Sequence, residues 1–265
     1  MTDLAARPSL STSVRWSISD IATVTRRNVI RQFRVPESIF FSTLQPIMFV
    51  LLFTFVFGGS IVVPGGYTNY LMPGIFVQTM VFGAVSTSIG LAEDLQSGLL
   101  ERFRALPMSR SAVLGGRTSA DFMRNMFVIV IMTAVGLMVG FRPQPNVLDY
   151  ALACVVMLLF AFSLMWGFAY IGLSAPNAET AQLMSFPILF PLTFASSCFV
   201  QVSSMPGWLQ PFAANQPVSQ AADAARSLML GGTYYNPDSV WKSLAWSVGL
   251  LAILAPLAVR KYRKV

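Results

Sequence analysis

Residues 148–173 read LDYALACVVMLLFAFSLMWGFAYIGL, and Asp149 is the only charged residue among them. Because the hydrocarbon core of a bilayer is about 30 Å thick, roughly 20 consecutive apolar residues can cross it as an α-helix. A soluble protein would need amphipathic elements to cover such a run, and none remain elsewhere in the chain. The run therefore predicts a transmembrane helix.

Five further apolar runs have the same character, at 38–59, 71–92, 121–140, 181–202 and 241–259. The composition agrees with them, since 55% of the residues are hydrophobic, 11% are charged and the mean hydropathy is +0.63. We therefore expect an all-α integral membrane protein with six transmembrane helices. A cytoplasmic segment, 1–36, would precede a single transmembrane domain, 37–265.

The charges follow the pattern of membrane topology. The formal net charge is +7 at pH 7, yet nearly all Lys and Arg residues lie between the apolar runs. They concentrate in 1–36, in the 93–118 loop and in the tail 260–264, whereas the opposite side carries only Arg142, Arg226 and Lys242. The positive-inside rule then predicts that both termini and the 93–118 loop are cytoplasmic. Because no RNA- or DNA-reading motif occurs, nucleic acid is not an expected partner.

Two segments outside the runs have helical periodicity. In 17–34, apolar residues share one side of a helical wheel and arginines share the other, which predicts an amphipathic helix at the cytoplasmic interface. This helix either braces the bundle or is only a topology signal. In 203–240, the part 218–230 is periodic and stops at Gly231. This connection either forms short helices that re-enter the outer leaflet or is an ordinary surface loop.

The chain lacks the residues that many catalytic and metal sites use. It contains no histidine, and its two cysteines, Cys154 and Cys198, lie inside apolar runs. No catalytic or metal site is expected, and the thiols either act as small buried hydrophobes or form a bridge between helices. Carboxylates are not evident deep in the spans, and Arg124 and Lys242 are expected to snorkel from span ends. An ion-coupled pump needs buried titratable groups, so that class is disfavoured.

Neutral polar and aromatic side chains within the spans are the candidates for a substrate path. Their simplest role is packing and hydrogen bonding between helices, but they also suit a route for an apolar or amphiphilic substrate. Pro187 and Pro191 bend the fifth span, which either gates such a route or only shapes the helix. The path candidates are Gln45, Gln78, Phe82, Ser86, Phe186, Phe190 and Thr193.

Charge is dense within the 93–118 loop. Residues 91–106 read LAEDLQSGLLERFRAL, with leucines and a phenylalanine at spacings of three and four. This spacing predicts a helix that continues out of the second span with one apolar side and ends at Pro107. The loop is either a plain topology signal or a short rigid helix that docks on a cytoplasmic protein.

Three stretches carry a family resemblance: YTNYLMPGIFVQTMVFG at 67–83, EDLQSGLLERFRALPMSRSAVLGGR at 93–117 and MPGWLQPFAANQPVSQAADAARSLMLGG at 205–232. Together they resemble the type-2 ABC exporter permeases, in particular the daunorubicin-resistance branch of drug-exporter membrane subunits. The resemblance covers about residues 20–262, and its three motifs occur in the expected order and topology.

The resemblance implies an exporter of apolar or amphiphilic substrates (drug, lipid or glycolipid) in a bacterial plasma (inner) membrane. It implies two permeases, the second being the same chain or a paralogue, which are surrounded by membrane lipid. It also implies two cytoplasmic ABC ATPase subunits. The segment 94–107 would be the coupling helix on the ATPase, 17–34 the connecting helix and 206–231 the re-entrant helices. The path would lie between the two permeases, lined by spans one, two and five. The residues carried over to ATPase coupling are Gly98, Glu101, Arg102, Arg104 and Pro107.

The chain itself has no phosphate-binding loop of the G-x-x-x-x-G-K-[ST] type. Its only lysines are Lys242, Lys261 and Lys264, and none follows a glycine in that pattern. We therefore expect no cofactor on this chain and ATP with Mg on the partner ATPase. One alternative is an ATP-independent facilitator or channel, which leaves the 94–107 helix without a role. Another is a membrane-embedded enzyme, for which the spans lack a nucleophile paired with a base.

Overall fold

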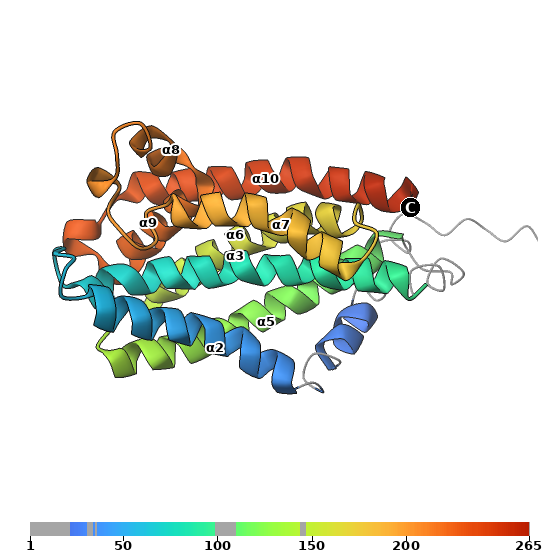
Figure 1. The fold of residues 1–265 in the computed structure, drawn as a ribbon, viewed down its shortest axis with the longest axis horizontal. Coiled ribbons are helices and arrows are strands. Elements are labelled where there is room, and N and C mark those ends of the chain that lie inside the picture. The colour runs from blue at the N-terminus through green and yellow to red at the C-terminus, as the bar shows by residue number, and fades with distance from the viewer. Residues whose placement is uncertain (1–21, 31–33, 35, 99–109, 144–146, 265) are drawn as a thin grey trace, which may run out of the picture.

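The computed structural model of the protein describes residues 22–30, 34, 36–98, 110–143 and 147–264. Within these ranges every regular element is helical and no strand occurs, so the expected all-α architecture is confirmed. The long helices run along a common axis and form an elongated bundle (Figure 1). They are α2 (Pro36–Leu52), α3 (Tyr67–Gln96), α5 (Arg110–Val139), α6 (Val147–Gly172), α7 (Ala178–Phe194) and α10 (Pro237–Lys264).

Four stretches are long and apolar enough to cross a membrane: Tyr67–Gln96, Leu114–Val139, Val147–Gly172 and Pro237–Lys264. The other two predicted spans differ. α2 continues into a π-helical turn, Phe53–Phe57, and so covers most of the predicted 38–59. α7 ends at Phe194, so the prediction of a helix through 202 is wrong in its last two turns. The count of six spans therefore stays a prediction.

α3 and α6 form the centre of the bundle. In the most apolar part of α3, 72% of the residues are buried, against 17% in α10 at the periphery. α6 packs against α3, α5, α7 and α10, and α3 also contacts α2. Glycines allow the backbones to approach closely: a Cβ on Gly74 would collide with the Cys198 carbonyl oxygen, and one on Gly172 with the Ser88 carbonyl oxygen. Small residues at such crossings are typical of helices that pack within a membrane.

The bundle has a basic end and an opposite end. At the basic end lie the 22–30 helix, the C-terminal end of α3 and the C-terminus (Figure 1). Residues 22–30 fall within the predicted amphipathic helix, and Val24 and Asn28 are its buried residues. On the predicted apolar side, Ala22 is exposed and Val29 is half-buried. At the opposite end lie α8 (Gln210–Asn215) and α9 (Pro217–Leu230).

The helix predicted to run without a break over 91–106 ends earlier. α3 stops at Gln96, and Gly98 has a φ of 66°. A glycine adopts this left-handed conformation without steric cost and commonly terminates a helix, so a continuous helix through this position is wrong. Of the predicted coupling residues, Gly98 therefore lies at this turn. Glu101, Arg102, Arg104 and Pro107 lie outside the described residues.

Candidate functional site

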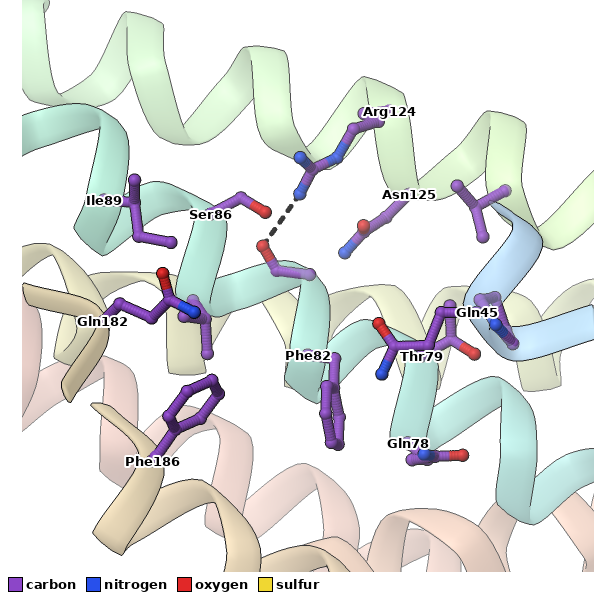
Figure 2. Close-up of a pocket in the computed structure, with 14 residues that line it drawn as sticks. Gln45, Gln78, Thr79, Phe82, Ser86, Ile89, Arg124, Asn125, Gln182 and Phe186 are labelled. Carbon is purple, nitrogen blue, oxygen red and sulfur yellow. Dashed lines mark hydrogen bonds between the residues drawn. The ribbon is translucent and has the colours of Figure 1, made fainter. Parts of the chain in front are cut away.

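A cavity of about 220 Å³ lies between α2, α3, α5 and α7, inside the bundle (Figure 2). Its mouth is marked by the exposed side chains of Gln45 on α2 and Gln182 on α7. Its remaining walls come mainly from α3 and α5. The lining residues are Gln45, Pro46, Gln78, Thr79, Phe82, Gly83, Val85, Ser86, Ile89, Arg124, Asn125, Val128, Gln182 and Phe186.

The structure brings five of the seven predicted path residues together in this cavity. Gln45, Gln78, Phe82, Ser86 and Phe186 all line it (Figure 2). They come from three helices that are distant in sequence, and the shared position follows from the packing of α2 and α7 against α3. α2 and α3 contact each other directly, as do α3 and α7.

The other two predicted path residues lie farther along α7. The ring of Phe190 contacts those of Phe82 and Phe186, with centroids 6.3 and 5.5 Å apart. Thr193 is buried and does not line the cavity; its hydroxyl has no hydrogen-bond partner in the part of the chain that the structure describes. Phe190 therefore extends the cavity wall, whereas Thr193 does not take part in it.

An aromatic ladder continues from the cavity toward the opposite end of the bundle. Phe186, Phe190 and Phe194 follow one another along α7, each ring centroid 5.5 Å from the next. The Phe199 ring then lies 5.4 Å from Phe194 and 4.5 Å from Phe53 of the π-helical turn. Phe190 and Phe194 are more than 40% exposed, so the ladder presents a continuous apolar surface beside the cavity mouth.

Two amide side chains in the cavity wall each have one buried atom without a hydrogen-bond partner among the described residues. Gln78 and Asn125 are 2% and 3% exposed, and neither the Gln78 Oε1 atom nor the Asn125 Nδ2 atom bonds to any residue that the structure describes. A buried polar atom without a partner costs about 1–3 kcal/mol, so such atoms commonly face a water or a ligand. Here both residues line the same cavity, one from α3 and one from α5.

Arg124 lines the cavity from α5. It was expected to snorkel from the end of a span; α5 begins at Arg110 and its apolar stretch runs from Leu114 to Val139, so the depth of Arg124 in the membrane stays a prediction. Its side chain points to the cavity and donates from Nη2 to the Gly83 carbonyl oxygen at 2.8 Å (Figure 2). It makes no ion pair with any carboxylate of the described residues.

The acidic residues beside it are engaged elsewhere. Asp121, one turn before Arg124, accepts a hydrogen bond of 2.6 Å from the Thr87 hydroxyl and lies 3.9 Å from Arg117 Nε. Arg117 also donates to Asp94 at 2.8 Å, across from α5 to α3. This group ties the basic ends of α3 and α5 together. A polar stripe at 117, 121, 124 and 125 on one side of α5 is the sequence signal that would have revealed it.

A second polar cluster lies at the opposite end, around Arg226 of α9. This arginine is 2% exposed, and each of its nitrogens donates. Nε bonds to the Tyr70 carbonyl at 2.9 Å, and Nη1 to Asp223 at 2.7 Å and the Ser197 hydroxyl at 3.2 Å. Nη2 bonds to the Ser197 and Cys198 carbonyls at 2.6 and 3.0 Å. The guanidinium also lies over the Tyr70 ring, 3.8 Å from its centroid.

This Arg226 cluster explains why α7 ends early. The carbonyl oxygens of 195–201 have left the helix, and in a membrane such groups need a donor from a neighbour. Arg226 supplies donors to two of them, and the Tyr67 hydroxyl donates to the Phe199 carbonyl at 3.0 Å. The sequence marked Arg226 only as a charge of the outer side. α9 itself is mostly buried, against α3, α6 and α10, so the surface-loop alternative for this segment is wrong.

The two thiols form no bridge. Cys154 lies in α6 and Cys198 in the segment after α7, and both are free. Cys198 is fully buried beside Arg226, as expected for a small hydrophobe. No group of three or more His, Cys, Asp or Glu residues within the described ranges is arranged to hold a metal ion.

The sequence can now be compared with those of known proteins. Residues 19–230 match the family of the ABC-2 type transporter. The chain belongs to this family. It is 35% identical to the daunorubicin resistance ABC transporter permease protein DrrB1 of Streptomyces coeruleorubidus, over 97% of this chain and 89% of that protein. It is 26% identical to the probable doxorubicin resistance ABC transporter permease protein DrrC of Mycobacterium tuberculosis, over 95% of this chain and 91% of that protein.

A more distant relative is the putative transport permease ycf38 of Porphyra purpurea, which is 24% identical over 86% of this chain and 80% of that protein. The resemblance inferred from the three motifs is thereby confirmed. The chain is the permease subunit of an ABC exporter and a multi-pass membrane protein. It is a non-catalytic subunit, and ATP hydrolysis belongs to a separate ABC ATPase partner.

Proposed function

We propose that this permease exports an apolar or amphiphilic substrate, a drug, lipid or glycolipid, through the cavity between α2, α3, α5 and α7. The observation that carries the proposal is the cavity itself, which combines amide and hydroxyl groups with the rings of Phe82 and Phe186. Such a mixture suits a molecule with a polar part and an apolar part. The adjoining aromatic ladder supports the choice, because it offers the apolar part a surface toward the opposite end of the bundle.

The topology that we propose has six spans, with α2 and α7 as the first and the fifth. Both termini and the 93–118 loop are cytoplasmic, and the membrane is a bacterial plasma membrane. Support comes from the charges, since Lys261, Arg263 and Lys264 lie in the last turn of α10 and Arg117 lies near the start of α5. These belong to the basic end, as the positive-inside rule requires of a cytoplasmic face. α8 and α9 are the re-entrant helices of the outer side.

The complex that we propose contains two permeases, identical or paralogous, and two ATPases. ATP and Mg bind to the ATPases, and the segment 94–107 transmits their closure to α3 and α5. The Asp94–Arg117 ion pair supports this route, because it joins α3 to α5 at the first residue of that segment. A push on the segment would move both helices together, and these two helices form much of the cavity wall.

Co-purification in mild detergent tests the proposed complex. The permease and its ATPase are expressed together, and the species that remain bound are identified by mass spectrometry. We expect a stoichiometric ATPase that is lost when 98–107 is replaced by a Gly/Ser segment of equal length, while the permease remains folded. A homo-oligomer that holds no ATPase and passes substrate without ATP would instead support the facilitator.

A further inference from the structure

Arg124 is the only charged residue among those that line the described cavity. Charged side chains within membrane spans are costly, and they usually face a partner or a functional cavity. Arg124 faces a cavity, and none of the described carboxylates pairs with it. The cavity lining therefore carries one positive charge and no negative one.

The donors at this part of the cavity exceed the acceptors. A guanidinium has five N–H groups, and the one hydrogen bond of Arg124 goes to the Gly83 carbonyl. The Asn125 Nδ2 atom, with two further N–H groups, has no acceptor among the described residues. Figure 2 shows both side chains entering the cavity from α5, with the Ser86 hydroxyl nearby on α3. Such a set of donors fits an anionic group with several acceptor oxygens, such as a phosphate or carboxylate.

The volume restricts what can enter. Pockets for drug-sized ligands measure about 300–1,000 Å³, whereas this cavity measures about 220 Å³. It has room for a headgroup and not for a whole amphiphile. The apolar part must then lie outside the cavity, against α2 and α7, which expose apolar side chains such as Met48 and Leu183, and against the aromatic ladder that begins at Phe186.

We propose that the cavity binds the anionic headgroup of an amphiphile, with Arg124 as its cationic anchor and the apolar tail resting on α2 and α7. This proposal rests on the proposed function and narrows its substrate class. A cationic amphiphile is disfavoured, because its charge would meet Arg124 with no carboxylate in the lining to compensate. The site prefers an anionic headgroup to a neutral or cationic one, whichever apolar tail is attached.

Equilibrium binding to the purified, full-length permease tests this without any need for ATP or the ATPase. The probes are short-chain fluorescent phosphatidylglycerol, the matching phosphatidylcholine, and doxorubicin as a cationic amphiphile. We expect phosphatidylglycerol to bind with an affinity at least about tenfold higher than that of phosphatidylcholine. Arg124→Gln should remove this preference, and Arg124→Lys should restore part of it. Arg142→Gln, which replaces an exposed arginine outside the cavity, should leave it unchanged.

Equal affinity for the two lipids would overturn the proposal even if Arg124→Gln did not fold, because that comparison uses the unmodified protein. Tighter binding of doxorubicin than of phosphatidylglycerol would overturn it as well. Glycerol 1-phosphate separates the sources of the anion: if it competes as well as the lipid does, the site reads a soluble anion and the assignment to an amphiphile is wrong. Loss of the ATPase during co-purification would count against the exporter complex alone, so the two failures are distinguishable.

Discussion

Replacing Arg226 should open the structure at the end of the bundle opposite the basic end. Arg226→Met keeps much of the length of the side chain and removes all five donors. The Cys198 carbonyl then loses its donor, at about 1–3 kcal/mol, and the Tyr70 and Ser197 carbonyls each lose one bond, at about 0.5 kcal/mol. The lost contact with the Tyr70 ring adds about 1 kcal/mol.

The ion pair adds little to this sum. Asp223 is 38% exposed and can turn to water, so its attraction to Arg226 is screened. The expected loss of stability is therefore about 3–5 kcal/mol, close to the usual cost of removing one partner from a buried polar network. For a chain of this length that corresponds to a decrease of the unfolding temperature of about 10 °C.

Cys198 provides the assay, because it is fully buried and its carbonyl oxygen accepts from Arg226. In a Cys154→Ser background it is the only thiol, and a maleimide dye reports how often the cluster opens. We expect Arg226→Met to label on the order of 100- to 1,000-fold faster and to unfold at a lower temperature. Arg226→Lys should have a labelling rate and an unfolding temperature between those of the parent and Arg226→Met, since a lysine cannot reproduce the planar fork of donors.

Arg142→Met is the matched control, because Arg142 is an exposed arginine whose side chain donates only to the carbonyls of Leu137, in the last turn of α5, and Phe141 among the described residues. It should change stability by no more than about 0.5 kcal/mol. Arg226→Met with unchanged labelling and an unfolding temperature within about 2 °C of the parent would refute the assignment of these bonds, since the expected 3–5 kcal/mol would be missing.

Three further substitutions test other contacts. Gly74→Val should prevent folding or lower the unfolding temperature strongly, because its Cβ would collide with a backbone carbonyl, whereas Gly249→Val has open space and should fold normally; similar melting curves for both would contradict this packing. Asp94→Asn should lower stability by about 1–3 kcal/mol because it leaves Arg117 without its closest carboxylate, as differential scanning fluorimetry would measure; an unchanged midpoint would mean the pair contributes nothing. Glu101→Arg should leave the permease folded and inserted but abolish stimulation of the ATPase, and normal ATPase activity with normal transport would refute its role in coupling.

The sequence predicted the helical spans well where the apolar runs are uniform. The run 148–173 differs from α6 by one residue at each end, because nothing within it competes with the helix. The prediction for the run 181–202 failed after Phe194, where the Ser197 and Cys198 carbonyls leave the helix and accept hydrogen bonds from Arg226. Such a partner lies about thirty residues away in the chain, and periodicity carries no information about it.

Only part of the cavity wall could be predicted from the sequence, because the cavity also depends on how distant helices pack. Gln45, Gln78 and Phe186 are polar or aromatic residues in apolar runs, so each was a candidate by itself. The place of Arg124 in the cavity wall was missed because its hydrogen-bond partner, Gly83, lies on another helix. Which side chains face a cavity depends on how α3 and α5 pack, and a hydropathy pattern carries no information about that packing.

ATP-driven transport through the cavity is the central claim, and one measurement in vesicles tests it directly. The permease and its ATPase are reconstituted with a fluorescent anionic amphiphile, and its movement across the membrane is followed after ATP is added. We predict movement that requires ATP and is lost in Ser86→Phe, which fills the cavity, while the ATPase remains bound. Movement that proceeds equally without ATP, or that Ser86→Phe leaves unchanged, would contradict the account.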